Sequence, residues 1–218
     1  MKRNLTLLAA TSAIALVPLG IATAKEPTQP ASSDAIIAYH DSGEWDADTA
    51  AVTKQAKTSL IAQLKKKPKK PAIVFDIDDT LESSYDCQKA SGSFGQVPSA
   101  VCVAQSNQTP IPQTKSLFKY AQKKKVAVDL ITGRPEGLRQ ATLDELKRDG
   151  FTGKFKLYLR PNDDPNKDSV IPYKSGARKS IQKAGYKILV NIGDQQSDLK
   201  GGFSVKRFKV PNPMYFTP

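Results

Sequence analysis

Four short segments of the sequence carry residues that together could bind a metal ion and transfer a phosphoryl group. They are residues 75–81 (FDIDDTL), 131–134 (ITGR), 173–175 (YKS) and 193–198 (GDQQSD). They offer carboxylates, hydroxyls, a lysine amine and glycine-flanked backbone amides. Carboxylate oxygens are ligands that Mg²⁺ accepts, and amines and backbone N–H groups bind phosphate. The four segments therefore predict one site for a divalent cation and a phosphate ester.

Asp76 and Asp78 are two positions apart and directly follow the apolar run 72–75 (AIVF). Phosphoryl transfer through a covalent intermediate needs two carboxylates with different roles. One attacks phosphorus, and the other moves a proton to and from the oxygens that leave and attack. Acidic turns after strands are common, so the Asp-x-Asp pattern is weak alone, but DIDDTL directly after an apolar run is a stronger signal. We expect Asp79 to brace the turn rather than react.

The other three segments add groups that suit the phosphate and the metal. Thr132 and Gly133 end a second apolar run just before a predicted helix, where a hydroxyl and free N–H groups can form an anion site. Lys174 stands at the start of a helix, where a cation opposes the helix dipole and a generic surface role is disfavoured. Asp194 and Asp198 follow another apolar run and could ligate a metal or orient Lys174.

Strands and helices alternate through the rest of the chain. The apolar runs predict strands over 72–75, 126–131, 156–159, 187–192 and 205–210. The intervening patterns predict helices over 117–124, 135–148 and 175–184, after helical pieces over 34–64. Such alternation predicts an α/β fold with a central parallel sheet and helices on both faces. Ligands of these sheets bind beyond the carboxyl ends of the strands, where the four segments would meet.

The N-terminus has the pattern of a bacterial secretory signal peptide. A basic start, an apolar run over 5–21 and the small residues of 22–24 (ATA) predict a cleaved segment over 1–24. A membrane anchor is the alternative, although the run is short and rich in small residues for a span. Residues 25–33 are then a flexible linker and 34–218 a single domain. The mature protein is expected to be periplasmic or extracellular, with no stable membrane insertion.

Residues 82–113 interrupt the alternation between the first strand and its helix. A segment this long without strong periodicity is usually functional or has a small fold of its own. We interpret it as a small cap over the site, the alternative being a plain surface excursion. It holds Cys87 and Cys102, which an oxidising compartment favours as a disulfide over two thiols. Two cysteines and one histidine cannot complete a usual four-ligand zinc site.

The formal net charge of the 218 residues is +12, and lysine runs at 65–70 and 123–125 contribute much of it. Clustered lysine is compatible with nucleic acid or an anionic surface, but a solvated surface is the simpler interpretation. An exported protein is not expected to bind nucleic acid, whereas a positive field attracts phosphorylated substrates. The one histidine, His40, excludes mechanisms that need a histidine pair.

Several segments together resemble a known family. Residues 39–43 (YHDSG), 173–175 (YKS), 191–195 (NIGDQ) and 208–215 (FKVPNPMY), with the four segments above, are similar to the haloacid dehalogenase (HAD) superfamily. Within it the chain resembles subfamily IIIB, the group of plant acid phosphatases and vegetative storage proteins. The resemblance implies a HAD-like Rossmannoid three-layer sandwich with a small cap inserted after the first motif.

The resemblance also implies roles for individual residues. Asp76 would be the nucleophile and Asp78 the acid/base, and the phosphate would be bound by Thr132, Gly133 and Lys174. The metal, Mg²⁺, would be held by Asp76, Asp194 and the main-chain carbonyl of Asp78. Asp198 and Thr80 would support these groups. The chain has Asp79 where members usually carry Glu and Gln196 where they carry Trp, and neither change removes a catalytic group.

These observations predict an exported, Mg²⁺-dependent acid phosphatase that hydrolyses small phosphate monoesters, such as nucleotides or sugar phosphates, through an aspartyl-phosphate. Transfer of the phosphoryl group to an alcohol is a variant of the same mechanism. One alternative is a non-catalytic binding or storage protein on the same fold. The other is a basic protein that binds anionic envelope polymers through its lysine clusters.

Overall fold

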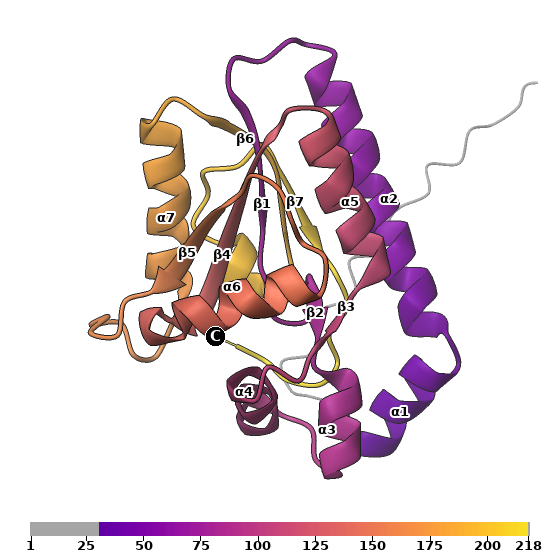
Figure 1. The fold of residues 1–218 in the computed structure, drawn as a ribbon. Helices are drawn as coiled ribbons and strands as arrows, with labels where there is room; N and C mark the ends of the chain where they lie inside the picture. Colours follow the sequence, from indigo (N-terminus) through magenta and orange to yellow (C-terminus); the bar gives the residue numbers. More distant parts are fainter. Residues whose placement is uncertain (1–30, 218) are drawn as a thin grey trace, which may run out of the picture.

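A computed structural model describes residues 31–217 of the chain. The predicted signal peptide and residues 25–30 of the predicted linker lie outside the described residues. The centre of the fold is a five-stranded sheet in the order β5-β4-β1-β6-β7, and every neighbouring pair in it is parallel (Figure 1). Its strands are β1 (Pro71–Phe75), β4 (Ala127–Pro135), β5 (Lys156–Arg160), β6 (Lys187–Gly193) and β7 (Lys206–Lys209).

Helices cover both faces of the sheet. On one face, α2 (Glu44–Leu64), α5 (Pro112–Lys123) and α6 (Arg139–Arg148) contribute apolar residues to the main core. On the other, Ile181 of α7 (Ile171–Lys183) packs against β1, β4 and β6. In Figure 1, α2 and α5 lie together on one side of the sheet and α7 on the other. The predicted α/β fold with a central parallel sheet is confirmed, and its apolar strand runs reflect burial on both faces.

The strand register brings the predicted site segments together. Phe75, the last residue of β1, pairs with Leu130 of β4 and with Ile192 of β6. The N–H of Asp76 then donates a hydrogen bond to the carbonyl of Ile192, at 3.0 Å. Because these strands are parallel and are aligned at Phe75, Leu130 and Ile192, the residues that come next emerge side by side at one edge.

Two boundaries differ from the sequence prediction in ways that matter for the site. β4 continues to Pro135, with an irregular register after Ile131, so Thr132 and Gly133 lie on an extended strand rather than in a turn. α7 begins at Ile171, with Pro172 in its first turn, where proline is well tolerated. Lys174 therefore lies within the first turn of this helix.

Residues 82–113 form a small unit beyond the carboxyl ends of the strands (Figure 1). It contains β2 (Glu82–Ser83), α3 (Tyr85–Ser91), α4 (Gln96–Ala104) and β3 (Thr109–Pro110), before α5 begins at Pro112. The two short strands pair antiparallel and close the base of the unit. The sequence shows no strong periodicity here because the helices have only seven and nine residues.

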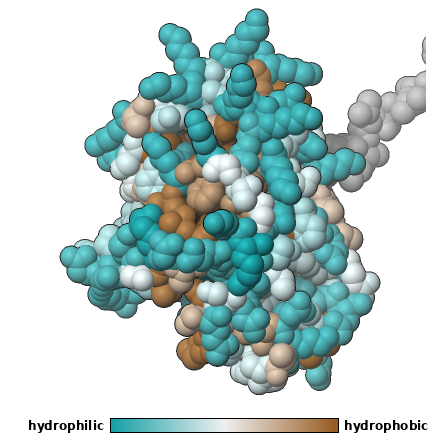
Figure 2. Space-filling model, in the orientation of Figure 1, coloured by the Kyte–Doolittle hydropathy of each residue, from teal (hydrophilic) through white to brown (hydrophobic). Residues whose placement is uncertain are grey.

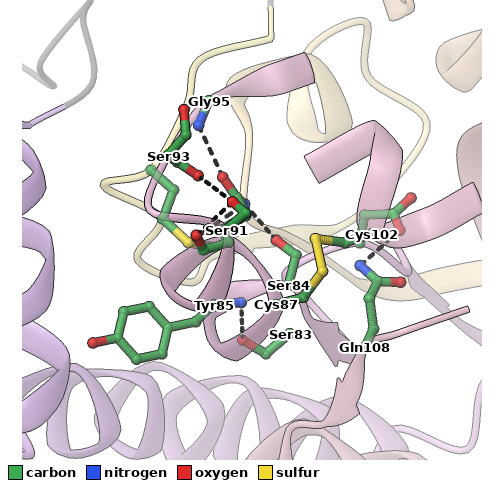
Figure 3. Close-up of a disulfide and its surroundings, with 12 residues drawn as sticks. Ser83, Ser84, Tyr85, Cys87, Ser91, Ser93, Gly95, Cys102 and Gln108 are labelled. Carbon is green, nitrogen blue, oxygen red and sulfur yellow. Dashed lines mark hydrogen bonds between the residues drawn. A yellow bond between two sulfur atoms is a disulfide. The ribbon is translucent and has the colours of Figure 1, made fainter. Parts of the chain in front are cut away.

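The disulfide that the sequence favours is present between Cys87 of α3 and Cys102 of α4 (Figure 3). It joins the two short helices across a sequence separation of 15 residues. Cys102 is buried, at 1% exposure. The bond therefore fixes α4 relative to α3, and α4 lines the pocket described below.

We predict that replacing both cysteines with serine lowers the free energy of unfolding by about 3 kcal/mol, because the denatured chain loses a closed loop. Urea denaturation of the oxidised protein and the double variant measures this difference. Reducing the original protein should reproduce most of it. Equal stability of oxidised, reduced and doubly substituted protein would contradict the prediction.

The N-terminal helix α1 (Ser33–Asp41) packs near the cap rather than against the sheet (Figure 1). Its His40 ring stacks on Tyr85, with centroids 3.8 Å apart, and on Trp45 at 4.6 Å. Burial lowers the pKa of His40 to about 4, so the ring is neutral near pH 7. His40 thus joins α1 to α3 and is not part of the pocket. Among residues 31–217, no helix is long and apolar enough to cross a membrane.

Candidate active site

A pocket of about 540 Å³ lies at the carboxyl ends of β1, β4 and β6, between the sheet and the cap. The cap contributes one face of α4, with Gln96, Ser99, Ala100 and Val103. The charged residues that line the pocket come from the sheet, from α7 and from α8: Asp76, Asp78, Arg134, Arg160, Lys174, Asp194 and Asp198. The convergence that the sequence predicted is therefore present for Asp76, Asp78, Gly133, Lys174, Asp194 and Asp198.

Asp76 and Lys174 form a buried ion pair at the base of the pocket. The Lys174 Nζ lies 2.7 Å from Asp76 Oδ1, and each residue is only 5% exposed. Burial and the charge of Asp198 raise the pKa of Asp76 well above its usual range, while Lys174 opposes the rise. Although burial lowers the pKa of Lys174, the charges of Asp198 and Asp76 raise it overall. Lys174 therefore stays an ammonium group directly beside Asp76.

Asp198 holds Lys174 from the other side. Its Oδ1 accepts a hydrogen bond from the Lys174 ammonium, and its Oδ2 accepts one of 2.8 Å from the Gln195 N–H. A Cβ at Gly193 would lie 2.4 Å from Asp198 side-chain atoms. Glycine is therefore needed at the end of β6 so that this carboxylate can fold back onto the start of α8 (Gln196–Leu199). Of the two roles that the sequence left open, the geometry favours orienting Lys174.

Asp194 is fixed by three donors, of which Thr80 and Asn212 come from distant parts of the chain and Gln195 is its neighbour in sequence. Its Oδ1 accepts from Thr80 at 3.1 Å, and its Oδ2 from Gln195 at 2.7 Å and from Asn212 at 2.8 Å. Burial, followed by the charges of Asp198 and Asp79, raises the pKa of Asp194 to about 7. Thr80, expected to be a supporting residue, thus donates a hydrogen bond to a carboxylate of the pocket.

Asp78 is held by Arg134, which the sequence analysis did not place among the site residues. Arg134 is 5% exposed. Its guanidinium donates to Asp78 Oδ1 at 2.8 and 3.1 Å and lies 2.5 Å from Glu145 Oε2. Burial raises the pKa of Asp78, but the charge and hydrogen bonds of Arg134 outweigh this and hold it below its usual range. Thr132 also donates to Asp78, at 3.2 Å, and has no exposed surface.

We predict that Arg134→Lys raises the pKa of Asp78, because lysine keeps the charge but loses the forked hydrogen bonds. In an NMR titration, the Asp78 carboxyl of the variant should titrate at higher pH than that of the unaltered protein. Arg139→Lys, at an exposed arginine of α6, is the matched control. A titration curve that superimposes on that of the unaltered protein would show that Arg134 does not control the pKa of Asp78.

The charge balance of the pocket suits a bound cation. Four aspartates line the pocket (Asp76, Asp78, Asp194 and Asp198) and Asp79 lies beside them, against the cations Lys174, Arg134 and Arg160, of which Arg160 is paired with Asp164. Oxygens of Asp76, Asp194 and Asp198 lie within 4.8 Å of one another, and all three residues are buried. An all-oxygen donor set with surplus negative charge fits a hard divalent cation such as Mg²⁺.

Comparison with known proteins identifies the family. The model of the family described as HAD superfamily, subfamily IIIB (Acid phosphatase) matches residues 4–218. The chain belongs to this family. The resemblance that the sequence motifs indicated is therefore confirmed.

Two curated relatives illustrate the range of this family. The chain is 35% identical over 150 residues to "Vegetative storage protein 1" of Arabidopsis thaliana, covering 66% of this chain and 55% of that protein. It is 35% identical over 148 residues to "Acid phosphatase 1" of Solanum lycopersicum, covering 66% and 58%. The matched part thus spans less than two thirds of the length of these relatives.

A solved structure confirms the fold. The class C acid phosphatase from Bacillus anthracis matches with a TM-score of 0.67 and 24% identity, over 84% of each chain. At this identity, the match shows that the two chains share a fold.

Several residues of the site could not be identified from local sequence patterns. Gln108, which follows the cap helices, donates to Asp78 at 3.2 Å and is itself bonded by Arg134 (Figure 3 shows Gln108 beside the disulfide). Asn212 and Tyr215 come from the C-terminal segment, and the Tyr215 hydroxyl lies 2.6 Å from Asp79 Oδ2. Only the family resemblance of residues 208–215 could have indicated the latter two. Asp79 is a brace, as expected, since Ser84 also bonds it.

Proposed function

We propose that this protein is an exported, Mg²⁺-dependent acid phosphatase that hydrolyses small phosphate monoesters through a phosphorylated Asp76. The observation that carries the proposal is the arrangement of Asp76 and Asp78 in one pocket, the first paired with Lys174 and the second with Arg134. A carboxylate beside an ammonium group can attack phosphorus, and a second carboxylate in the same pocket can carry the proton. Family membership supports the same chemistry.

In the first step, an Asp76 carboxylate oxygen attacks phosphorus and the bond to the ester oxygen breaks. The alcohol leaves with a proton that reaches it through Asp78. In the second step, water attacks phosphorus, its proton goes to Asp78, and the bond to Asp76 breaks to release phosphate. The Lys174 ammonium stabilises negative charge on the transferring group, as preorganised donors do in phosphoryl transfer. Backbone groups at Gly133, which lines the pocket, would bind the phosphate, and the Thr132 hydroxyl would join them if it turned from Asp78, to which it donates in the structure.

Arg134 sets a condition on the first step, because it keeps Asp78 ionised before substrate binds. Negative charge on a bound phosphate ester would raise the pKa of Asp78. A monoanionic ester would also bring the proton that the leaving alcohol needs. The ester is increasingly monoanionic as pH falls below its second pKa near 6, so this arrangement favours activity at acid pH.

The metal would be held by Asp76 and Asp194 with the main-chain carbonyl of Asp78. When bound, it would offset the charge of the carboxylates and of the phosphate. Without compensation, the surplus of acids would repel an anionic substrate, so turnover should depend on a divalent cation.

The decisive experiment is a phosphatase assay on the mature protein with p-nitrophenyl phosphate, with and without chelator. We expect turnover that chelation reduces by at least about a hundredfold, in line with the several kcal/mol that a metal contributes, and that added Mg²⁺ restores. Calorimetry with Mg²⁺ in the absence of substrate should show binding that Asp194→Asn weakens. Absence of turnover over a broad pH range with Mg²⁺ present would favour the storage alternative, which the names of some relatives keep open.

A set of small phosphate esters would then define the substrate class. A pocket of about 540 Å³, with α4 as one wall, suits nucleotides and sugar phosphates better than polymers. Salt-sensitive binding of anionic envelope polymers that does not depend on Asp76 would instead support the second alternative.

A further inference from the structure

A second pocket, of about 690 Å³, lies at the opposite edge of the sheet from the catalytic groups. It is formed where β1, β4 and β5 begin, with the end of α5 and the turn before β6. β1 has five residues, so about 17 Å of strand separates the two edges. Its polar and aromatic lining is dominated by Lys70, Lys125, Lys154, Lys156, Phe155 and Tyr186.

Four lysines surround this pocket, and two of them belong to the lysine runs that stand out in the sequence. Lys70 ends one run and Lys125 the other, and the fold brings them to the same edge. Within residues 31–217, none of the four ammonium groups forms a salt bridge. The one acid of the pocket is Asp129, which is 3% exposed. The four positive charges around this pocket are therefore not balanced by acidic residues in its lining.

Tyr186 holds two of these lysines in place. The Nζ atoms of Lys70 and Lys156 lie 5.6 and 5.5 Å from the centre of its ring. Lys70 Nζ also donates to the Ala184 carbonyl, at 3.4 Å. A cation–π contact leaves most N–H donors of the ammonium group available for other hydrogen bonds. The pair is therefore positioned while most of its hydrogen-bonding capacity remains for a ligand.

Two of the lysines have a backbone conformation that is more usual for glycine. Lys70 has φ 43° and Lys125 φ 57°, in the left-handed region, which costs a residue with a Cβ about 1 kcal/mol. After α6 and α7 the chain uses Gly150 and Gly185 for the same purpose, with φ 74° and 85°. Lysine thus follows α5 where glycine follows two other helices.

The loop that carries Lys154 is built against α5. Gln122 donates to the carbonyls of Thr152 and Lys154, at 2.9 and 3.4 Å. A Cβ at Gly153, whose φ is 93°, would lie 2.8 Å from the Gln122 amide. The positive φ of Gly153 favours glycine there, and the two hydrogen bonds from Gln122 attach the loop to α5 beside the pocket.

We propose that this pocket binds an anion that contains linked phosphate groups. The pocket is larger than one phosphate needs, and four ammonium groups against one carboxylate match a ligand with about three negative charges. Lysine binds phosphate as a point charge and needs no fixed orientation. The hydrophobic part of the lining includes Val126 and Val128. In the view of Figure 2 the surface is mostly hydrophilic, with hydrophobic patches near its middle. The proposal is independent of the phosphatase activity.

The test is an NMR titration of the full mature protein with tripolyphosphate, with a non-hydrolysable ATP analogue and with orthophosphate. The amide signals of Gly153 and Gly185 report the new pocket, and those of Gly133 and Gly193 report the catalytic one. We expect the first pair to respond to tripolyphosphate at a concentration at least about tenfold lower than to orthophosphate. Tighter binding of the ATP analogue would identify a nucleotide, and equal binding an inorganic chain of phosphates.

Matched variants distinguish binding in this pocket from a general effect of the protein's net charge. Lys125→Gln with Lys156→Gln should weaken tripolyphosphate binding about tenfold or more, whereas Lys147→Gln with Lys183→Gln, on exposed helix positions, should change it little. Asp129→Asn, which removes the opposing charge, should tighten binding. Equal weakening by both lysine pairs, or responses confined to Gly133 and Gly193, would overturn the proposal.

Discussion

Replacing Asp76 with Asn should reduce turnover of phosphate monoesters by a factor of at least about a thousand, because an amide oxygen cannot serve as the nucleophile. The fold should persist. Burial and neighbouring acids raise the pKa of Asp76, so its ionised form costs stability near neutral pH. Asn removes that cost and leaves Lys174 paired with Asp198. We therefore expect the free energy of unfolding to be unchanged or higher.

Kinetics with p-nitrophenyl phosphate and urea denaturation measure the two quantities separately. Asp86→Asn, at an exposed acid of the cap, is the matched control and should retain full activity. Asp76→Asn with more than a tenth of the original kcat would mean that another group attacks phosphorus.

Replacing Lys174 with Met should affect both stability and activity. The substitution leaves Asp76 and Asp198 without the cation that lies between them, and removing one partner of a buried ion pair costs about 3–5 kcal/mol. Loss of a preorganised donor at the transferring group should lower kcat by a factor of about a hundred to a thousand. The stability deficit should shrink as pH falls, because Asp76, with its raised pKa, then takes up a proton.

Urea denaturation at pH 7 and pH 5 tests this account. Lys183→Met, at an exposed position near the end of the same helix, removes equal charge and serves as control. If both variants have the same stability at pH 7, Lys174 does not compensate the buried acids.

The positions of Asp76 and Asp194 could be predicted from the sequence because each follows an apolar run that has to be a central strand. Level ends of parallel strands then bring them together without any knowledge of side-chain contacts. Lys174 is different, since composition does not distinguish it from the other lysines. The family resemblance selected it, and in the structure it forms an ion pair with Asp76.

The partners of Asp78 could not be predicted in the same way. Arg134 ends the segment ITGR, and this motif gives no indication that the side chain turns back towards Asp78 and Glu145. That direction depends on the extension of β4 and on the packing of α6. Gln108 follows helices too short to show periodicity. Contacts that depend on the path of a loop are not encoded in local patterns.

The central claim is that Asp76 becomes covalently phosphorylated during turnover. The most direct test is to mix the protein with substrate and Mg²⁺, stop the reaction in acid, and search by mass spectrometry for a peptide carrying one phosphoryl group. The account predicts that modification on Asp76, lost when hydroxylamine is added and absent from the Asp76→Asn variant. A phosphoryl group on a different residue, or turnover without any phosphorylated protein under rapid quenching, would contradict it.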